Sequence, residues 1–197
     1  MKVTKTKLPE VLIMEPDAFG DSRGFFLETW SKNRYEQAGI LLPFVQDNVS
    51  FSSKNVLRGL HFQYPHSQGK LIGVLSGEVF DVAVDIRLGS PSFGQWVGEI
   101  LSVSNHKQFY IPPGFAHGFC VLSDTVLFSY KCTDYYSGKD DGGIIYNDPD
   151  LKIDWPVEAP SLSKKDAALP RLKDLPKNKL PKFEECLPSA ASAKEGK

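Results

Sequence analysis

Glycine and proline divide this chain into short segments, and their spacing limits the possible folds more than any other feature. The 16 glycines and 14 prolines interrupt the 197 residues more than once in every ten positions on average. Most segments between them alternate apolar with polar residues or are rich in β-branched residues, which predicts an all-β sandwich or barrel. The clearest strands are expected at residues 55–63, 70–75, 79–87, 94–101, 108–111, 118–122 and 126–133. Ser76-Gly77, between the second and third of these, predicts a tight hairpin turn.

Only a few short segments favour a helix. Ser31 is a suitable N-cap for a helix at Lys32–Ala38, and Gly39 supplies its C-terminal stop. A second short helix is expected to begin at Ser163. Strands and helices do not alternate along the chain, so a Rossmann-type sheet is not expected.

Length and composition favour one domain. A chain of 197 residues that is 41% hydrophobic can bury a sizeable core, which is expected to span residues 1–186. Residues 187–197 are small, polar and charged, and we expect them to be a disordered tail. The 23 basic and 24 acidic residues nearly cancel, so no overall field is available to hold a nucleic acid or an anionic membrane.

A reducing, cytoplasmic location is expected. An apolar run near the start, Val11–Met14, has only four residues, which is too short for a signal peptide or a membrane span. Cys120, Cys132 and Cys186 are odd in number and lack CxxC spacing, which argues against a disulfide framework and a zinc cluster.

The segment around His117 contains a motif that bears on the fold. Pro112, Gly114 and His117 have the spacing Pro-x-Gly-x-x-His, which resembles the second sequence motif of the cupin superfamily. This resemblance implies a cupin-type jelly-roll β-barrel with a few short helices. By itself the motif indicates fold more than function.

Many cupins use this motif together with a first motif to hold a metal. That first motif supplies a His-x-His pair and a downstream Glu. Here His61 is followed by Phe62 and Gln63 instead, and Lys70 occupies the next position at which an acidic residue would be expected. A lysine cation would oppose a divalent ion, so no metal is expected.

A histidine, a lysine and a tyrosine buried in one barrel suit proton transfer at carbon. His61 is the candidate base, and Lys70 is the candidate cation that stabilises the resulting enolate. Inversion also needs a proton donor on the opposite face of the ring. Tyr130 shares an apolar strand face with Val126 and Phe128, so its hydroxyl could serve. The alternative is a core tyrosine whose hydroxyl is satisfied by a backbone carbonyl.

Several longer motifs connect the chain with a known family. They are Asp21–Glu28, Gln46–Asn48, Arg58–Gln63, Gln68–Leu71, Gly77–Arg87 and Pro113–Phe119. In this order they resemble the family of dTDP-4-dehydrorhamnose 3,5-epimerases, over roughly residues 7–170. The resemblance implies a homodimeric, cofactor-free cupin that inverts C3 and C5 of dTDP-4-dehydro-6-deoxy-glucose on the route to L-rhamnose.

The resemblance also implies roles for individual residues. The family's base matches His61, its opposite-face acid matches Tyr130, the carboxylate that orients the base matches Asp166, and Lys70 matches the cation beside the ketone oxygen. Contacts with the nucleotide are implied for Arg23, Glu28, Gln46, Asn48, Arg58, His117, Tyr136, Asp141 and Lys165. Tyr136 would stack on the thymine, and an arginine fork suits the diphosphate. Asp141 stands where a glutamate contact is expected.

Two alternatives remain open at this point. Relatives that epimerise only C3, or that act on the 4-keto sugar of another nucleotide, share much the same motifs. A non-catalytic cupin that merely binds a sugar nucleotide is the second alternative. The tail beyond Pro170 is longer and richer in lysine and proline than the family core requires.

One geometric conflict lies within the strand that carries the base. Strict alternation would place Arg58 on the face opposite His61, yet both residues are needed at one ligand. Glycine in a strand often marks a bulge that redirects the next side chain. We therefore predict an irregularity at Gly59, or an Arg58 that reaches the ligand around the strand edge.

Overall fold

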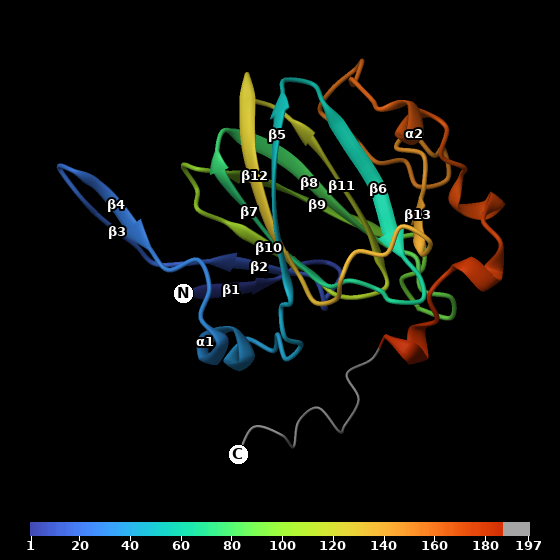
Figure 1. Cartoon of the computed structure of the whole chain (residues 1–197), viewed down its shortest axis with the longest axis horizontal. Helices are drawn as coiled ribbons and strands as arrows, with labels where there is room; N and C mark the ends of the chain where they lie inside the picture. Colours follow the sequence, from blue (N-terminus) through green and yellow to red (C-terminus); the bar gives the residue numbers. More distant parts are fainter. Residues whose placement is uncertain (187–197) are drawn as a thin grey trace.

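The computed structural model describes residues 1–186, and its strands form two antiparallel sheets that face each other (Figure 1). One sheet has six strands, in the spatial order β1 (Lys2–Lys5), β2 (Leu12–Glu15), β10 (Gln108–Ile111), β7 (Lys70–Ser76), β12 (Thr125–Cys132) and β5 (Gln46–Ser53). The other has five, in the order β13 (Asp141–Gly143), β6 (Leu57–Gln63), β11 (Phe115–Val121), β8 (Glu78–Asp85) and β9 (Trp96–Ser102). The expected all-β, cupin-type jelly roll is confirmed.

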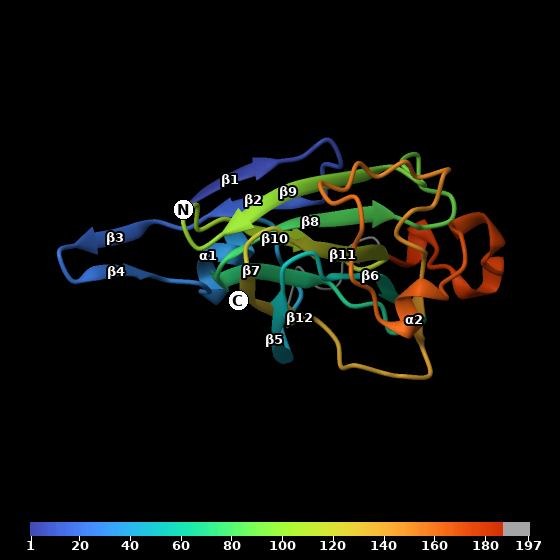
Figure 2. The same ribbon diagram turned by 90° about the horizontal axis from the view of Figure 1, so that it is seen from above.

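A separate hairpin projects from this barrel. It consists of β3 (Ala18–Asp21) and β4 (Gly24–Leu27), which pair only with each other. Seen from above, the hairpin extends from one end of the molecule, and the C-terminal part of the described chain packs at the other (Figure 2). The expected disordered tail, residues 187–197, lies outside the described residues.

All seven expected strands are present, with ends that differ by a few residues. The expected hairpin at Ser76-Gly77 is wrong. β7 pairs with β10 and β12, whereas β8 pairs with β9 and β11, so the chain crosses from one sheet to the other at this point. Gly77 does have a positive φ of 86°, and a Cβ there would lie 2.2 Å from the Thr125 carbonyl oxygen. The turn signal was correct, but such a signal does not identify the pairing partner.

Both expected helices are present. α1 (Lys32–Gln37) follows Ser31 and ends before Gly39, whose φ is 94°. α2 (Lys164–Ala167) begins after Ser163, whose hydroxyl accepts a hydrogen bond from the Asp166 backbone N–H. Within residues 1–186, no helix is long and apolar enough to cross a membrane.

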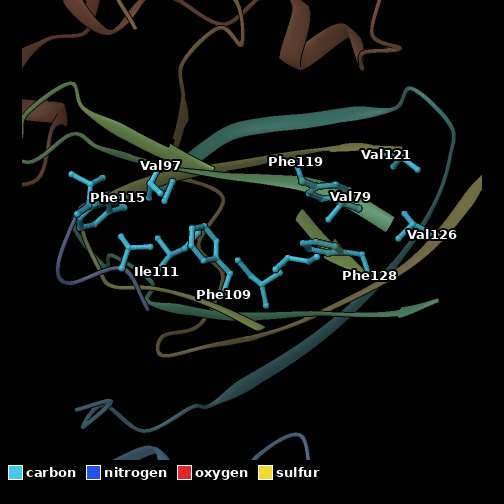
Figure 3. Packing of buried hydrophobic residues seen from close by; sticks show 14 residues of the cluster. Val79, Val97, Phe109, Ile111, Phe115, Phe119, Val121, Val126 and Phe128 are labelled. Carbon is cyan, nitrogen blue, oxygen red and sulfur yellow. The ribbon is translucent and has the colours of Figure 1, made fainter. Parts of the chain in front are cut away.

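The largest apolar cluster fills the space between the two sheets. Figure 3 shows labelled members of it from both sheets, among them Val79, Phe109, Phe119 and Phe128, packed against one another. Phe119 and Phe128 stack with ring centroids 4.0 Å apart, and both rings also border the cavity described below. Truncating a buried phenylalanine to alanine typically costs about 3–5 kcal/mol of folding stability, so these contacts strongly stabilise the packing of the two sheets.

The segment after Pro170, for which the sequence offered no account, packs on the five-stranded sheet. Leu172 and Leu180 join a second apolar cluster there. Further on, Phe183 lies against the guanidinium of Arg87, a fully buried residue that is ion-paired with Asp85. Three short 3-10 helices carry this segment, at Leu172–Asp174, Lys177–Lys179 and Phe183–Glu185.

Candidate active site

A cavity of about 350 Å³ opens between the two sheets, beside α2. Strands β5, β6, β7, β11, β12 and β13 contribute side chains to it. Of the site residues predicted from the sequence, nine line this cavity: Arg58, His61, Lys70, His117, Tyr130, Tyr136, Asp141, Lys165 and Asp166.

His61 is fixed by a buried carboxylate. Its Nε2 lies 2.6 Å from Oδ1 of Asp166, a residue that is only 4% exposed. Asp166 sits in the first turn of α2, where the Ser163 cap fixes its backbone. Because a carboxylate can only accept, Nε2 carries the proton and the lone pair is on Nδ1.

Burial lowers the pKa of His61 below its ordinary value, while Asp166 opposes this effect and the Lys70 and Lys165 cations add to it. The imidazole is therefore neutral at neutral pH. A neutral imidazole with a free ring nitrogen can accept a proton, which is what a general base requires.

The predicted irregularity at Gly59 is confirmed. Between β6 and β11, His61 pairs with His117 and Arg58 pairs with Phe119, so β6 has one residue more than its partner over this stretch. Gly59 has a φ of 114°, and a Cβ there would lie 2.6 Å from the His117 carbonyl oxygen. The extra residue brings Arg58 to the same cavity as His61. Arg58 is held there by a 3.1 Å hydrogen bond from its Nε to the Ser52 hydroxyl of β5.

Lys70 and Tyr130 face the two histidines from the other sheet. Lys70 begins β7, and burial lowers the pKa of its ammonium. Within the described part of the chain it has no ion-pair partner within 4.0 Å, so its charge is available to a ligand. Burial raises the pKa of the Tyr130 hydroxyl, which therefore stays protonated at neutral pH. His61 and Tyr130 thus approach the cavity from opposite sheets.

Sequence reasoning missed Asp81, which holds the second histidine. This residue of β8 is fully buried, and both of its carboxylate oxygens lie 3.0 Å from Nε2 of His117. The arrangement leaves Nδ1 of His117 for the cavity. Burial raises the pKa of Asp81, against the opposing influence of His117 and Lys70. A charged residue within the apolar run Val79–Val84 was the signal that could have identified it.

The rim of the cavity carries three of the predicted nucleotide contacts. The Tyr136 hydroxyl donates to Asp141 at 3.4 Å, and the Lys165 ammonium pairs with the same carboxylate. Gln46 and Asn48 lie on the adjacent strand β5 but do not line the cavity. Gln46 accepts a hydrogen bond from the Tyr136 backbone N–H and donates to the Asn48 side chain.

Two predicted residues lie far from this cavity within one chain. Arg23 is at the tip of the β3–β4 hairpin, where its side chain is 87% exposed and pairs with Asp21. Glu28 follows the hairpin and pairs with Arg34 at 3.3 Å. The hairpin points away from α2 in both views (Figures 1 and 2).

Among residues 1–186, no group of three or more histidine, cysteine, aspartate or glutamate side chains could hold a metal ion.

Comparisons with known proteins cover the part of the chain that lines this cavity. The family model described as dTDP-4-dehydrorhamnose 3,5-epimerase covers residues 5–174. An enzyme of that name from Pseudomonas aeruginosa is 55% identical over 168 residues, which are 84% of this chain and 93% of the relative.

Solved structures agree. A 3,5-epimerase from Legionella pneumophila in complex with dTDP-4-keto-L-rhamnose superimposes with a TM-score of 0.91 at 56% identity, covering 92% of this chain and 98% of the other. A 3'-monoepimerase from Streptomyces bikiniensis in complex with dTDP-quinovose gives a TM-score of 0.85 at 30% identity, covering 91% and 93%. This chain belongs to the dTDP-4-dehydrorhamnose 3,5-epimerase family.

Proposed function

We propose that this protein is a sugar-nucleotide epimerase that converts dTDP-4-dehydro-6-deoxy-D-glucose to dTDP-4-dehydro-L-rhamnose, a step of dTDP-L-rhamnose biosynthesis. The observation that carries the proposal is the placement of a neutral His61, fixed by buried Asp166, across one cavity from Lys70 and Tyr130. Family membership supplies the substrate.

His61 begins the reaction by taking a proton from C3 or C5 of the sugar. Both carbons flank the C4 ketone, so the electron pair of the broken C–H bond moves to the ketone oxygen as an enolate. The Lys70 cation stabilises that oxygen, in surroundings where burial strengthens the interaction. Tyr130 then donates its proton to the same carbon from the opposite face, which inverts the centre. Exchange with water returns the proton to Tyr130 and removes it from His61.

Nucleotide binding is assigned to the rest of the cavity. Arg58 and Lys165 supply positive charge for the diphosphate, and His117 supplies the ring nitrogen that Asp81 leaves free. Tyr136, whose ring is exposed at the rim, suits stacking on the thymine.

The active unit is proposed to be a homodimer. The hairpin presents Phe19, Phe25 and Phe26 to solvent, and β5 presents Val49 and Phe51 on the outer face of the six-stranded sheet. A second copy packed on this face would cover the exposed rings. It would also allow the hairpin to carry Arg23 and Glu28 into the partner's cavity.

The proposed location is the cytoplasm. Cys120, Cys132 and Cys186 are all free thiols, in keeping with a reducing compartment.

A C3-only epimerase is the alternative reaction, because one relative with that name has the same fold. The higher identity to enzymes named 3,5-epimerases favours inversion at both carbons.

A heavy-water experiment tests reaction and position together. The purified protein is incubated with dTDP-4-dehydro-6-deoxy-D-glucose in D₂O and the product is examined by proton NMR. Deuterium at both C3 and C5, with the L-configured sugar, is the expected result. Deuterium at C3 alone would identify the monoepimerase, and retention of both protons would reject epimerase activity.

A further inference from the structure

Three glutamines hold four consecutive backbone residues beside the cavity. The segment Asp134–Ser137 follows β12 and has no regular secondary structure, so no strand ladder fixes it. Each residue nonetheless has one backbone group bonded to a glutamine side chain. The bonds run from Gln68 Nε2 to the Asp134 carbonyl at 2.8 Å, from Gln63 Nε2 to the Tyr135 carbonyl at 3.2 Å, from the Tyr136 N–H to Gln46 Oε1 at 3.0 Å and from the Ser137 N–H to Gln63 Oε1 at 2.8 Å.

Gln63 is the centre of this glutamine clamp, which we define as Gln46, Gln63 and Gln68. It is only 5% exposed and also donates to the His66 carbonyl at 2.9 Å. Its amide therefore ties together the loop after β6 and the loop after β12. Because the three glutamines come from β5, the end of β6 and the loop before β7, both sheets grip the same short segment.

The clamp fixes the backbone of Tyr136 but leaves its side chain free. The Tyr136 side chain is 61% exposed at the cavity rim, and its hydroxyl makes one long bond to Asp141. A flat ring on a fixed backbone suits stacking, because the segment loses little conformational entropy when a ligand binds. A flexible loop would lose more conformational entropy on binding, which would weaken the affinity.

We infer that Gln63 and Gln68, which also line the cavity, are positioning residues for nucleoside recognition that act through Tyr136. The inference rests on the proposed function, since it takes the stacked ligand to be the base of a dTDP-sugar. It assigns no chemical step to either glutamine, so it predicts an effect on binding and little on catalysis.

Gln63→Met tests this, because methionine has similar length but cannot form the three hydrogen bonds. The expected result is a Kd for dTDP about tenfold higher by calorimetry, a matching rise in KM, and kcat and its pH profile within about twofold of the wild type. Affinity for inorganic pyrophosphate, which has no nucleoside, should stay unchanged. Gln68→Met removes only one bond and should weaken dTDP binding by about threefold.

Gln108→Met is the matched control, because Gln108 is another buried glutamine bonded to a backbone carbonyl, that of Thr29, outside this cavity. It should leave the Kd for dTDP unchanged. A double-mutant cycle completes the test. In the Tyr136→Ala background, Gln63→Met should add little further loss, because the clamp acts through that ring.

Three outcomes would overturn the inference: unchanged dTDP affinity in both clamp variants, equal loss of dTDP and pyrophosphate affinity, or fully additive losses in the cycle. Failure of the proposed function looks different, because the heavy-water experiment would then show no exchange, or exchange at C3 alone, in the wild-type protein. Should Gln63→Met fail to fold, the Gln68→Met variant with half-buried Gln68 decides by the same measurements.

Discussion

The cavity wall and the β3–β4 hairpin carry residues proposed for one ligand, but they hold them in opposite ways. On the wall, His61 is fixed by a carboxylate that is 4% exposed. On the hairpin, Arg23 pairs only with its near neighbour Asp21, and 87% of its side chain is exposed. An exposed pair of this kind contributes about 0–1 kcal/mol, so the hairpin does not preorganise its arginine. The difference is what we expect if one chain builds the chemistry and, as proposed, a second copy completes the ligand-binding site.

The largest effect on activity is expected from substitutions in the cavity wall. His61→Ala should lower kcat by about 10³- to 10⁴-fold and remove deuterium exchange at both carbons, because the enolate forms only after the imidazole has removed the C–H proton. Tyr130→Phe should reduce completed inversion more than exchange, since abstraction by His61 still occurs. NMR in D₂O measures both quantities. Parallel loss of exchange and inversion in the two variants would contradict the separate roles of acid and base.

Lys70 should come next in size. Lys70→Met should lower kcat by about a hundred- to a thousandfold, because the enolate oxygen loses its preorganised cation. KM should change little, since the charge that matters develops only in the transition state. Lys70→Arg is the control that keeps the charge, and it should recover part of the rate. A change confined to KM would instead make Lys70 a binding residue.

Removing the carboxylate behind the base gives a smaller effect with a defined sign. Asp166 raises the pKa of His61 while burial lowers it, so Asp166→Ala leaves burial unopposed and the pKa falls further. The active, neutral imidazole then persists to lower pH, and the acid limb of the kcat/KM profile should move to lower pH. The weaker base should also lower kcat, by about tenfold. A limb that moves to higher pH would be incompatible with this role.

The hairpin should give the smallest effect, confined to binding. Arg23→Ala should raise KM by about tenfold with kcat nearly unchanged, because a charged hydrogen bond to the ligand is lost. Mixing the Arg23→Ala protein with inactive His61→Ala protein tests whether the hairpin serves the cavity of its own chain or that of the partner. A hybrid dimer in which the hairpin serves the partner's cavity contains one complete site, so low-KM activity should appear. If KM stays high in the mixture, Arg23 serves its own chain or none.

The sequence predicted the buried strands well, because their apolar residues face the core. It missed β5 for a physical reason. Val49 and Phe51 of that strand are exposed, whereas Ser50 lines the cavity and Ser52 is buried. The usual pattern, with apolar residues on the inner face of the strand, is therefore reversed. The inner face of β5 borders a polar site, and its outer face is exposed in the single chain.

The site residues were predictable to the extent that they lie in motifs. His61 and Arg58 could be placed together because Gly59 allowed a bulge, and this was confirmed. Asp81 could not be assigned, because its contact with His117 runs diagonally between neighbouring strands, where the partner of Asp81 in the ladder is Phe119. The distance of Arg23 from the cavity was equally hidden, since a motif states which residues occur together in sequence and not in which copy they act.

The His61–Asp166 contact also has a consequence for how the protein is made. The two residues are 105 positions apart, and the strands around them pair across similar separations, β5 with β12 and β2 with β10. Such non-local pairing makes folding slow and late. A nascent chain on the ribosome therefore has no oriented base until residue 166 has emerged, 105 residues after His61 itself.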